Sequence, residues 1–196
     1  MKKQLLATAC SLAVLMPAGI TSIAKADSLD NQLSLTQNNN EVNLSSLTPD
    51  QLQQYSDFIS EGFNVTVEKD EQGNIFISGY QVQTTTPKAR AAIYESAYTI
   101  KQALYHGYRL IGTTRGVINI TSNGSTVTIG TDTLYTQNTI GATKSRATGN
   151  PGVLRYNFQI MEANGMNGSG YIPMQTTYSI YKDGSIKFYN NLSLKN

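Results

Sequence analysis

The sequence predicts an α+β domain, in which an antiparallel sheet of roughly five to seven strands packs on one long helix, with a short N-terminal helix before it. Three observations support this fold class. Helix-boundary residues flank residues 49–61, and apolar residues recur at helical spacing between residues 87 and 106. After residue 115, apolar and polar residues alternate in most of the chain, as they do in half-buried strands.

The first 26 residues have the pattern of a signal peptide. Two lysines precede an apolar run, and an A-x-A cleavage site ends at Ala26. The run is shorter than the roughly 20 residues that cross a bilayer, so we expect a mature chain that begins at Asp27 and has no transmembrane segment. Residues 27–46, rich in Asn, Gln and Ser, predict a flexible polar leader. Residues 47–196 predict a single α+β domain.

The signal predicts an exported bacterial protein that is secreted or bound at the cell surface, or periplasmic where the source has two membranes. Cys10, the only cysteine, lies in the signal, so the mature chain can form no disulfide. Removal of the three lysines of the signal takes the formal charge from +2 to −1, which argues against a nucleic-acid partner. Residues 27–71 hold nine acids and one base, and the rest holds four acids and eleven bases. Either the two parts neutralise each other, or the basic part meets an anionic partner.

The stretch LTPDQLQQYSDFISEGF predicts the N-terminal helix. Thr48 suits the N-cap, Pro49 the first helical position, and Gln51 completes a capping box. Gly62 predicts the end of the helix, in a left-handed position after which the next side chain contacts Phe58.

Residues 64–83 predict a β-hairpin with its turn at residues 70–73, because Val and Ile alternate with polar residues on both sides. From Pro87 to about His106 the pattern changes to helical spacing, with these apolar residues on one stripe: Ala89, Ile93, Ala97, Ile100 and Leu104. This pattern predicts the long helix, ended by Gly107. We expect His106, the only histidine, to be exposed at that helix end rather than catalytic.

Period-two alternation predicts antiparallel strands in residues 116–130, 154–160, 172–180 and 186–194. Asn-Gly at residues 123–124 and Asp-Gly at residues 183–184 mark hairpin turns. Residues 136–152 have no useful period and predict a long loop, which in a compact domain is often functional or disordered.

Few side chains are suited to catalysis. One histidine cannot build a multi-histidine metal site, and an exposed helix end is a poor place for a Ser-His-Asp triad. Glu162 continues the inward side of its strand and is the candidate for carboxylate-dependent hydrolysis, although a solvated strand end is the alternative. No nucleophile elbow, phosphate loop or zinc motif is present. The sequence therefore predicts no metal and no cofactor, and it gives no positive reason for an enzyme.

Two sets of residues are candidates for ligand binding. One set consists of cations in and after the predicted loop, which would bind an anionic polymer or else only solubilise the loop: Lys144, Arg146 and Arg155. The other lies on the flank of the long helix and would stack on sugar rings or else be covered by the N-terminal part: Tyr94, Tyr98 and Lys101.

We therefore expect a non-catalytic exported bacterial domain that acts as a binding or interaction module at the cell surface or in the extracellular space. Its partner would be an anionic cell-wall polymer, a carbohydrate or another surface protein. One alternative is a small secreted hydrolase of glycans or cell wall centred on Glu162. Another is a secreted toxin or bacteriocin-like factor, because the Thr-rich residues 125–145 have a composition also found in hairpins that insert into membranes.

Overall fold

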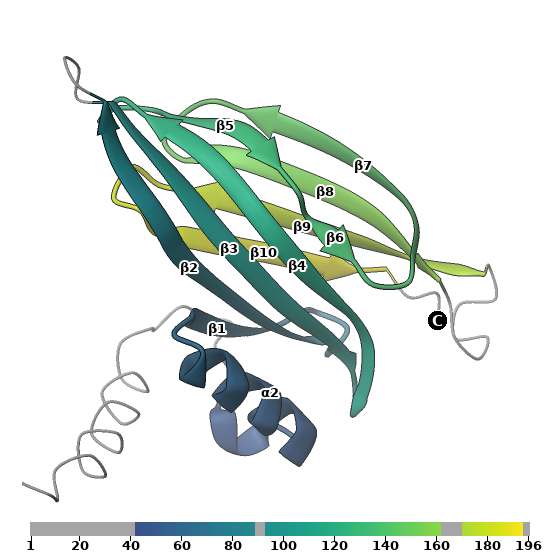
Figure 1. The fold of residues 1–196 in the computed structure, drawn as a ribbon. Coiled ribbons are helices and arrows are strands. Elements are labelled where there is room, and N and C mark those ends of the chain that lie inside the picture. The colour runs from purple at the N-terminus through teal and green to yellow at the C-terminus, as the bar shows by residue number, and fades with distance from the viewer. Residues whose placement is uncertain (1–41, 89–92, 162–169, 194–196) are drawn as a thin grey trace, which may run out of the picture. The chain divides into compact units, whose positions relative to one another are not determined.

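The computed structural model describes residues 42–88, 93–161 and 170–193 (Figure 1). These residues form two antiparallel sheets, one α-helix and a short 3-10 turn, η1 (Leu44–Ser46). Sheet A has the strand order β1-β2-β3-β4-β5, with β6 also paired to β4. Its strands are β1 (Asn64–Lys69), β2 (Ile75–Lys88), β3 (Ile93–His106), β4 (Arg109–Ser122), β5 (Val127–Asp132) and β6 (Tyr135–Thr136). Sheet B has the order β10-β9-β8-β7, with the strands β7 (Thr139–Ala147), β8 (Gly152–Met161), β9 (Tyr171–Ile180) and β10 (Ile186–Leu192).

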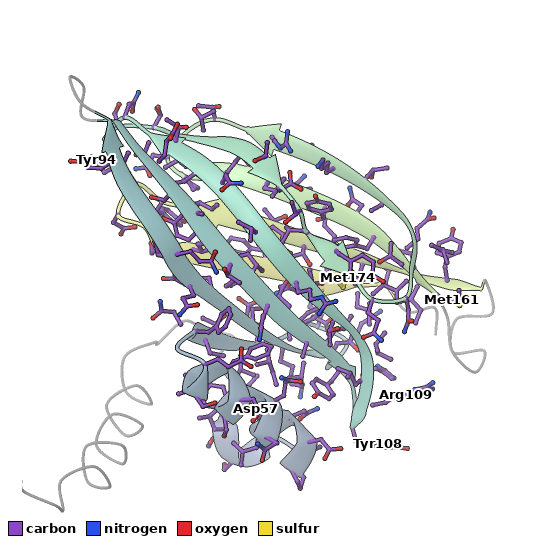
Figure 2. All side chains as sticks on the ribbon, in the orientation of Figure 1. Asp57, Tyr94, Tyr108, Arg109, Met161 and Met174 are labelled. Carbon is purple, nitrogen blue, oxygen red and sulfur yellow. The ribbon has the colours of Figure 1, made fainter. Side chains whose placement is uncertain are left out.

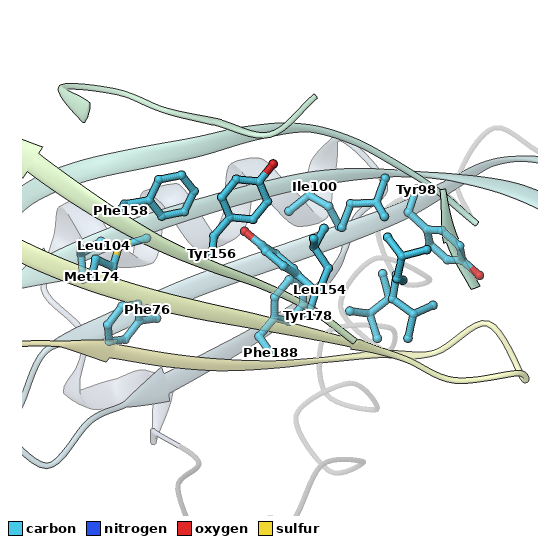
Figure 3. Close-up of a cluster of buried hydrophobic side chains, with 14 of the residues drawn as sticks. Phe76, Tyr98, Ile100, Leu104, Leu154, Tyr156, Phe158, Met174, Tyr178 and Phe188 are labelled. Atoms are coloured by element: carbon cyan, nitrogen blue, oxygen red, sulfur yellow. The ribbon is translucent and has the colours of Figure 1, made fainter. Parts of the chain in front are cut away.

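The predicted fold class, a sheet packed on one long helix, is wrong. The residues expected to form that helix lie in β3, which pairs with β2 on one side and β4 on the other. The mostly β architecture is a sandwich, because residues of both sheets form one apolar cluster. Figure 3 shows Phe76 and Leu104 of sheet A close to Phe158 and Met174 of sheet B.

The N-terminal helix is confirmed as α2 (Pro49–Ser60). Its capping box is present, and Gly62 has φ 86°. The backbone N–H of Phe63 donates to the Phe58 carbonyl at 3.0 Å, and the two rings are 5.9 Å apart. This is the Schellman geometry that the sequence predicts.

Helix α2 covers part of the outer face of sheet A. Phe58 and Phe63 pack there with Ile77 and Ala103, which are fully buried. The helix approaches β2 closely at Gly79, where an added Cβ would lie 3.1 Å from the Phe63 side chain. Val42 and Leu44, at the end of the predicted leader, contact the same cluster.

The inner faces of both sheets carry polar side chains at the middle of the strands, and we call these residues the polar belt. In sheet A the belt consists of five residues, and each lies directly opposite the next one on the adjacent strand: Thr66, Ser78, Gln102, Thr114 and Thr136. In sheet B the corresponding row is Lys144, Tyr156, Thr176 and Asn190. The belt lies between an apolar group around Phe76 and Phe158 and another around Tyr98 and Leu154. Figure 3 shows these two groups with Tyr156 of the belt between them.

The polar belt explains why β3 has a helical pattern in the sequence. Tyr98, Ile100 and Leu104 face the core with period two, but Gln102 takes an inward position and Ala103 is buried under α2. One inward polar residue and one outward apolar residue are enough to break the alternation.

The predicted loop at residues 136–152 contains the edge strand β7, which pairs with β8. Most of its side chains are exposed on both faces, so it lacks an apolar side that would reveal period two. The hairpin of β1 and β2 and the turns at Gly124 and Gly184 are confirmed, with positive φ at both glycines.

Candidate functional site

Lys144 and Arg146 lie on β7 and are joined to one acid, Asp132 of β5. Lys144 Nζ lies 3.1 Å from both Asp132 oxygens, and Arg146 Nη2 and the Tyr156 hydroxyl also contact the carboxylate. The Asp132 side chain has no exposed surface, whereas the two cations are 43% and 39% exposed. The cluster connects the edge of sheet A to the edge of sheet B.

The electrostatics of this cluster follow from its contacts. Burial raises the pKa of Asp132, but hydrogen bonds from Tyr156, Arg146 and Lys144 outweigh burial and hold the pKa below its usual value. Burial and the neighbouring carboxylate raise the pKa of the Tyr156 hydroxyl. The carboxylate is therefore ionised and compensated within the fold.

Arg155, the third predicted cation, lies on the outward face of sheet B. Its Nε donates to Thr177 Oγ1 at 3.3 Å. Lys144 and Arg146 contact Asp132 and Tyr156 on the other side of the sheet. The three cations do not come together, and the two on β7 already have an anion.

The residues of the predicted tyrosine row are separated because β3 is a strand. Tyr98 is 2% exposed and lies in the core, whereas Tyr94 is 45% exposed near the start of the strand. Lys101 faces α2, where it forms an ion pair with Glu61 and lies 5.1 Å from the centre of the Phe63 ring. This contact also joins the acidic N-terminal part to the basic remainder. These residues do not form one stacking surface.

His106 is half-buried at the end of β3, not exposed at a helix end as predicted. Its Nδ1 lies 2.7 Å from Asn74 Oδ1, and Asn74 Nδ2 donates to Asp70 Oδ2 at 2.7 Å. Since Asn74 turns its Nδ2 to the carboxylate, its oxygen accepts from His106, which donates from Nδ1. The arrangement ties the β1–β2 turn to the end of β3. Glu162, the candidate for hydrolysis, lies outside the described residues.

A shallow groove of about 570 Å³ crosses the outward face of sheet B. Side chains directly opposite each other form a row across its four strands: Thr143 of β7, Asn157 of β8, Gln175 of β9 and Asn191 of β10. Adjacent strands lie about 4.8 Å apart, so the row spans about 14 Å. Gln159, two residues from Asn157, adds a fourth amide, and we call this surface the amide groove.

A hydrogen bond orients two of the amides in the groove. Gln175 Nε2 donates to Asn157 Oδ1 at 2.7 Å. The Asn157 Nδ2 group then remains as a donor and the Gln175 Oε1 atom as an acceptor, side by side. A Cβ added at Gly141 would lie 3.1 Å from Gln159 Oε1, so the glycine leaves room for that amide. At Asn157 and Gln175 the groove therefore presents a donor and an acceptor next to each other.

Apolar surface borders these amides. Tyr171 and Pro173 line the groove, and Tyr189, two residues before Asn191 on the same face of β10, is 55% exposed. Met161 is 56% exposed at the end of β8 (Figure 2). None of the described residues that line the groove is charged. The surface is suited to a neutral ligand that carries many hydroxyl groups and also has apolar faces.

No family model matches the chain, and no similar curated protein or solved structure was found. No helix in residues 42–88, 93–161 and 170–193 is long and apolar enough to span a membrane. Within the same residues, no three His, Cys, Asp or Glu side chains are grouped so that they would hold a metal ion.

The amide groove is not among the predicted sites, because the strand predictions rest on the apolar side of each strand. The polar side contained the signal, since Asn and Gln recur at outward positions of neighbouring strands: Asn157, Gln159, Gln175 and Asn191. Amides are common on solvated strand faces, and only strand pairing shows that these four share one surface.

Proposed function

We propose that the protein is an exported, non-catalytic binding module that holds a neutral polysaccharide on the amide groove. The observation that carries the proposal is the row of amides across sheet B, in which Gln175 and Asn157 are joined by a hydrogen bond and which Tyr171 and Tyr189 border. Each hydroxyl of a sugar both donates and accepts hydrogen bonds, so it matches neighbouring amide donors and acceptors. Sugar ring faces are apolar enough to pack on tyrosine.

The charge distribution favours a carbohydrate over an anionic wall polymer. The groove has no charged residue among its described lining, and Lys144 and Arg146 are both paired with Asp132 on the other side of the sheet. Arg155 and Lys187 lie on the outward face of the same sheet but do not line the groove, and Arg155 donates a hydrogen bond to Thr177. Export rests on the signal sequence at residues 1–26.

The test is a pull-down of the mature protein on insoluble polysaccharides and on isolated cell walls, followed by titration with soluble oligosaccharides. The double variant Asn157→Ala/Gln175→Ala removes the hydrogen-bonded pair in the middle of the row. Each lost amide contact costs about 1 kcal/mol, so we expect the Kd to rise roughly tenfold or more.

The matched control is Asn119→Ala. Asn119 is an amide on the outward face of sheet A, and its Nδ2 donates to Thr131 Oγ1 at 2.9 Å beside a second groove. Its loss should leave binding unchanged. Equal binding by the double variant, or binding that disappears between about 0.05 M and 0.5 M salt, would overturn the proposal, because a neutral ligand is not screened by salt.

A further inference from the structure

The edge strand β10 is held to sheet A by a series of directed hydrogen bonds through the core. The Tyr178 hydroxyl donates to Gln102 Oε1 at 2.7 Å, and Gln102 Nε2 donates to Asn190 Oδ1 at 3.1 Å. Asn190 Nδ2 then donates to Glu68 Oε2 at 3.0 Å. Every donor points toward the carboxyl group of Glu68, where the series ends.

Glu68 is the one member of this series with a carboxyl group, and its position is unusual for an acid. It lies on the inner face of β1 and is half-buried, since Val67 next to it packs under α2 on the other face. No ion pair among the described residues involves Glu68. Its one described hydrogen bond comes from the neutral amide of Asn190.

The charged groups of the surrounding elements point elsewhere. Lys69, beside Glu68 on β1, is exposed. On α2, across the sheet, Asp50 and Asp57 are exposed, and Glu61 just after the helix is paired with Lys101. The described ionisable side chain of β2 is Tyr80, which packs on Phe188, and on β10 Lys187 and Tyr189 are both exposed. Ionised Glu68 therefore has no described cation to compensate it.

We propose that Glu68 is a proton-controlled latch, which holds β10 against sheet A when it is protonated and releases that strand when it is ionised. The protonated acid keeps one oxygen free to accept from Asn190. The ionised acid would remain in the half-buried position without compensation, so it favours a state in which β10 moves away and water reaches the carboxylate.

The latch would regulate the amide groove, and this part rests on the proposed function. Tyr189 and Asn191 flank Asn190 in β10, and their side chains lie on the opposite, outward face. Asn191 lines the groove. When the inward contacts of β10 are released, the strand moves and displaces the binding residues on its outward face.

The proton affinity of Glu68 sets the range in which the latch works. Burial raises the pKa of Glu68 to about 7, against a smaller opposite effect of the Asn190 hydrogen bond. In the open state the pKa of Glu68 returns to its ordinary value of 4.5. The equilibrium constant for the opening of β10 is therefore unaffected below about pH 4.5 and rises up to about 300-fold above pH 7. The groove would thus be more ordered in mildly acidic surroundings.

The experiment is hydrogen exchange of β10 amides in the mature protein at about pH 5 and about pH 8, corrected for intrinsic exchange rates. In the natural protein the opening equilibrium should rise by up to about two orders of magnitude. Glu68→Gln keeps a side-chain oxygen that accepts from Asn190 but has no titratable proton. In this variant the opening equilibrium of β10 should not change with pH. Glu71→Gln, which removes an exposed acid from the β1–β2 turn, should behave like the natural protein.

If Glu68→Gln fails to fold, a pH titration by NMR of the unaltered protein decides the matter. The Glu68 carboxyl, the Asn190 side-chain amide and the β10 backbone amides should share one midpoint near neutrality. Separate midpoints, or the same pH dependence in Glu68→Gln as in the natural protein, would overturn the latch.

Polysaccharide binding measured at about pH 5 and about pH 8 separates the remaining outcomes. Absence of binding at both overturns only the proposed function, and equal binding at both overturns the link between latch and groove.

Discussion

Replacement of Asp132 by alanine tests whether the buried acid joins the two sheets. Asp132 contacts Lys144, Arg146 and the Tyr156 hydroxyl. In the variant the buried hydroxyl loses its acceptor, which costs about 1–3 kcal/mol. The two cations are more than a third exposed and can turn to water, so each adds only about 0–1 kcal/mol. We expect the free energy of unfolding to fall by about 2–4 kcal/mol.

The assay is urea unfolding at neutral pH, followed by circular dichroism and tyrosine fluorescence. For a domain of this size the loss corresponds to a Tm lower by roughly 5–15 °C. Asp132→Asn is the matched control, because an amide oxygen still accepts from Tyr156 but has no charge for the cations. It should lose about 1–2 kcal/mol. A double-mutant cycle with Tyr156→Phe should show a coupling of about 1–2 kcal/mol.

The difference between the natural protein and Asp132→Ala should also depend on pH. Because the contacts lower the pKa of Asp132, its contribution to stability is complete above its unfolded value of about 3.9 and is lost as pH falls through the lower folded value. The free energies of unfolding of the natural protein and of Asp132→Ala should therefore approach each other toward about pH 2. A loss below about 0.5 kcal/mol at neutral pH, additive effects in the cycle, or a difference that is constant with pH would refute the reasoning.

Three further predictions concern packing, the polar belt and the sheet edge. Gly79→Ala should lower the free energy of unfolding by about 1–3 kcal/mol in urea, because the new methyl group meets Phe63 under α2; an unchanged midpoint would contradict this contact. Gln102→Leu should cost about 1–3 kcal/mol in the same assay by leaving the Tyr178 hydroxyl without an acceptor, and adding Tyr178→Phe should recover part of the loss. Lys144→Val removes an inward charge from the edge strand β7, so we expect more light scattering during refolding, and equal scattering would show that this charge does not protect the edge.

Local sequence was sufficient for elements whose signals are local. The cap residues of α2, the glycines of the turns and the alternating strands β8 and β9 follow from contacts between near neighbours in the chain. The prediction of a sheet on a long helix is wrong at β3, where Gln102 faces the core and Ala103 lies under α2. The prediction of a loop is wrong at β7, because neither face of this strand is apolar.

The predicted ligand-binding cations do not form one site, for a related reason. Lys144, Arg146 and Arg155 are close in sequence, but strand geometry places the third on the opposite side of sheet B from the partners of the first two. Sequence spacing alone does not show this, because the mostly exposed residues of β7 predict a loop. The amide groove depends on pairing between four strands, which no single stretch of sequence specifies.

The sequence by itself determined the expectation of export, the absence of disulfides in a chain with one cysteine, and the elements with complete local signals. The tertiary structure alone decided which polar residues meet. Glu68 and Asn190 are 122 positions apart, and Asp132 reaches its partners across two sheets. The physical reason is that a strand has no partner of its own, so the surroundings of its side chains depend on distant segments that pair with it.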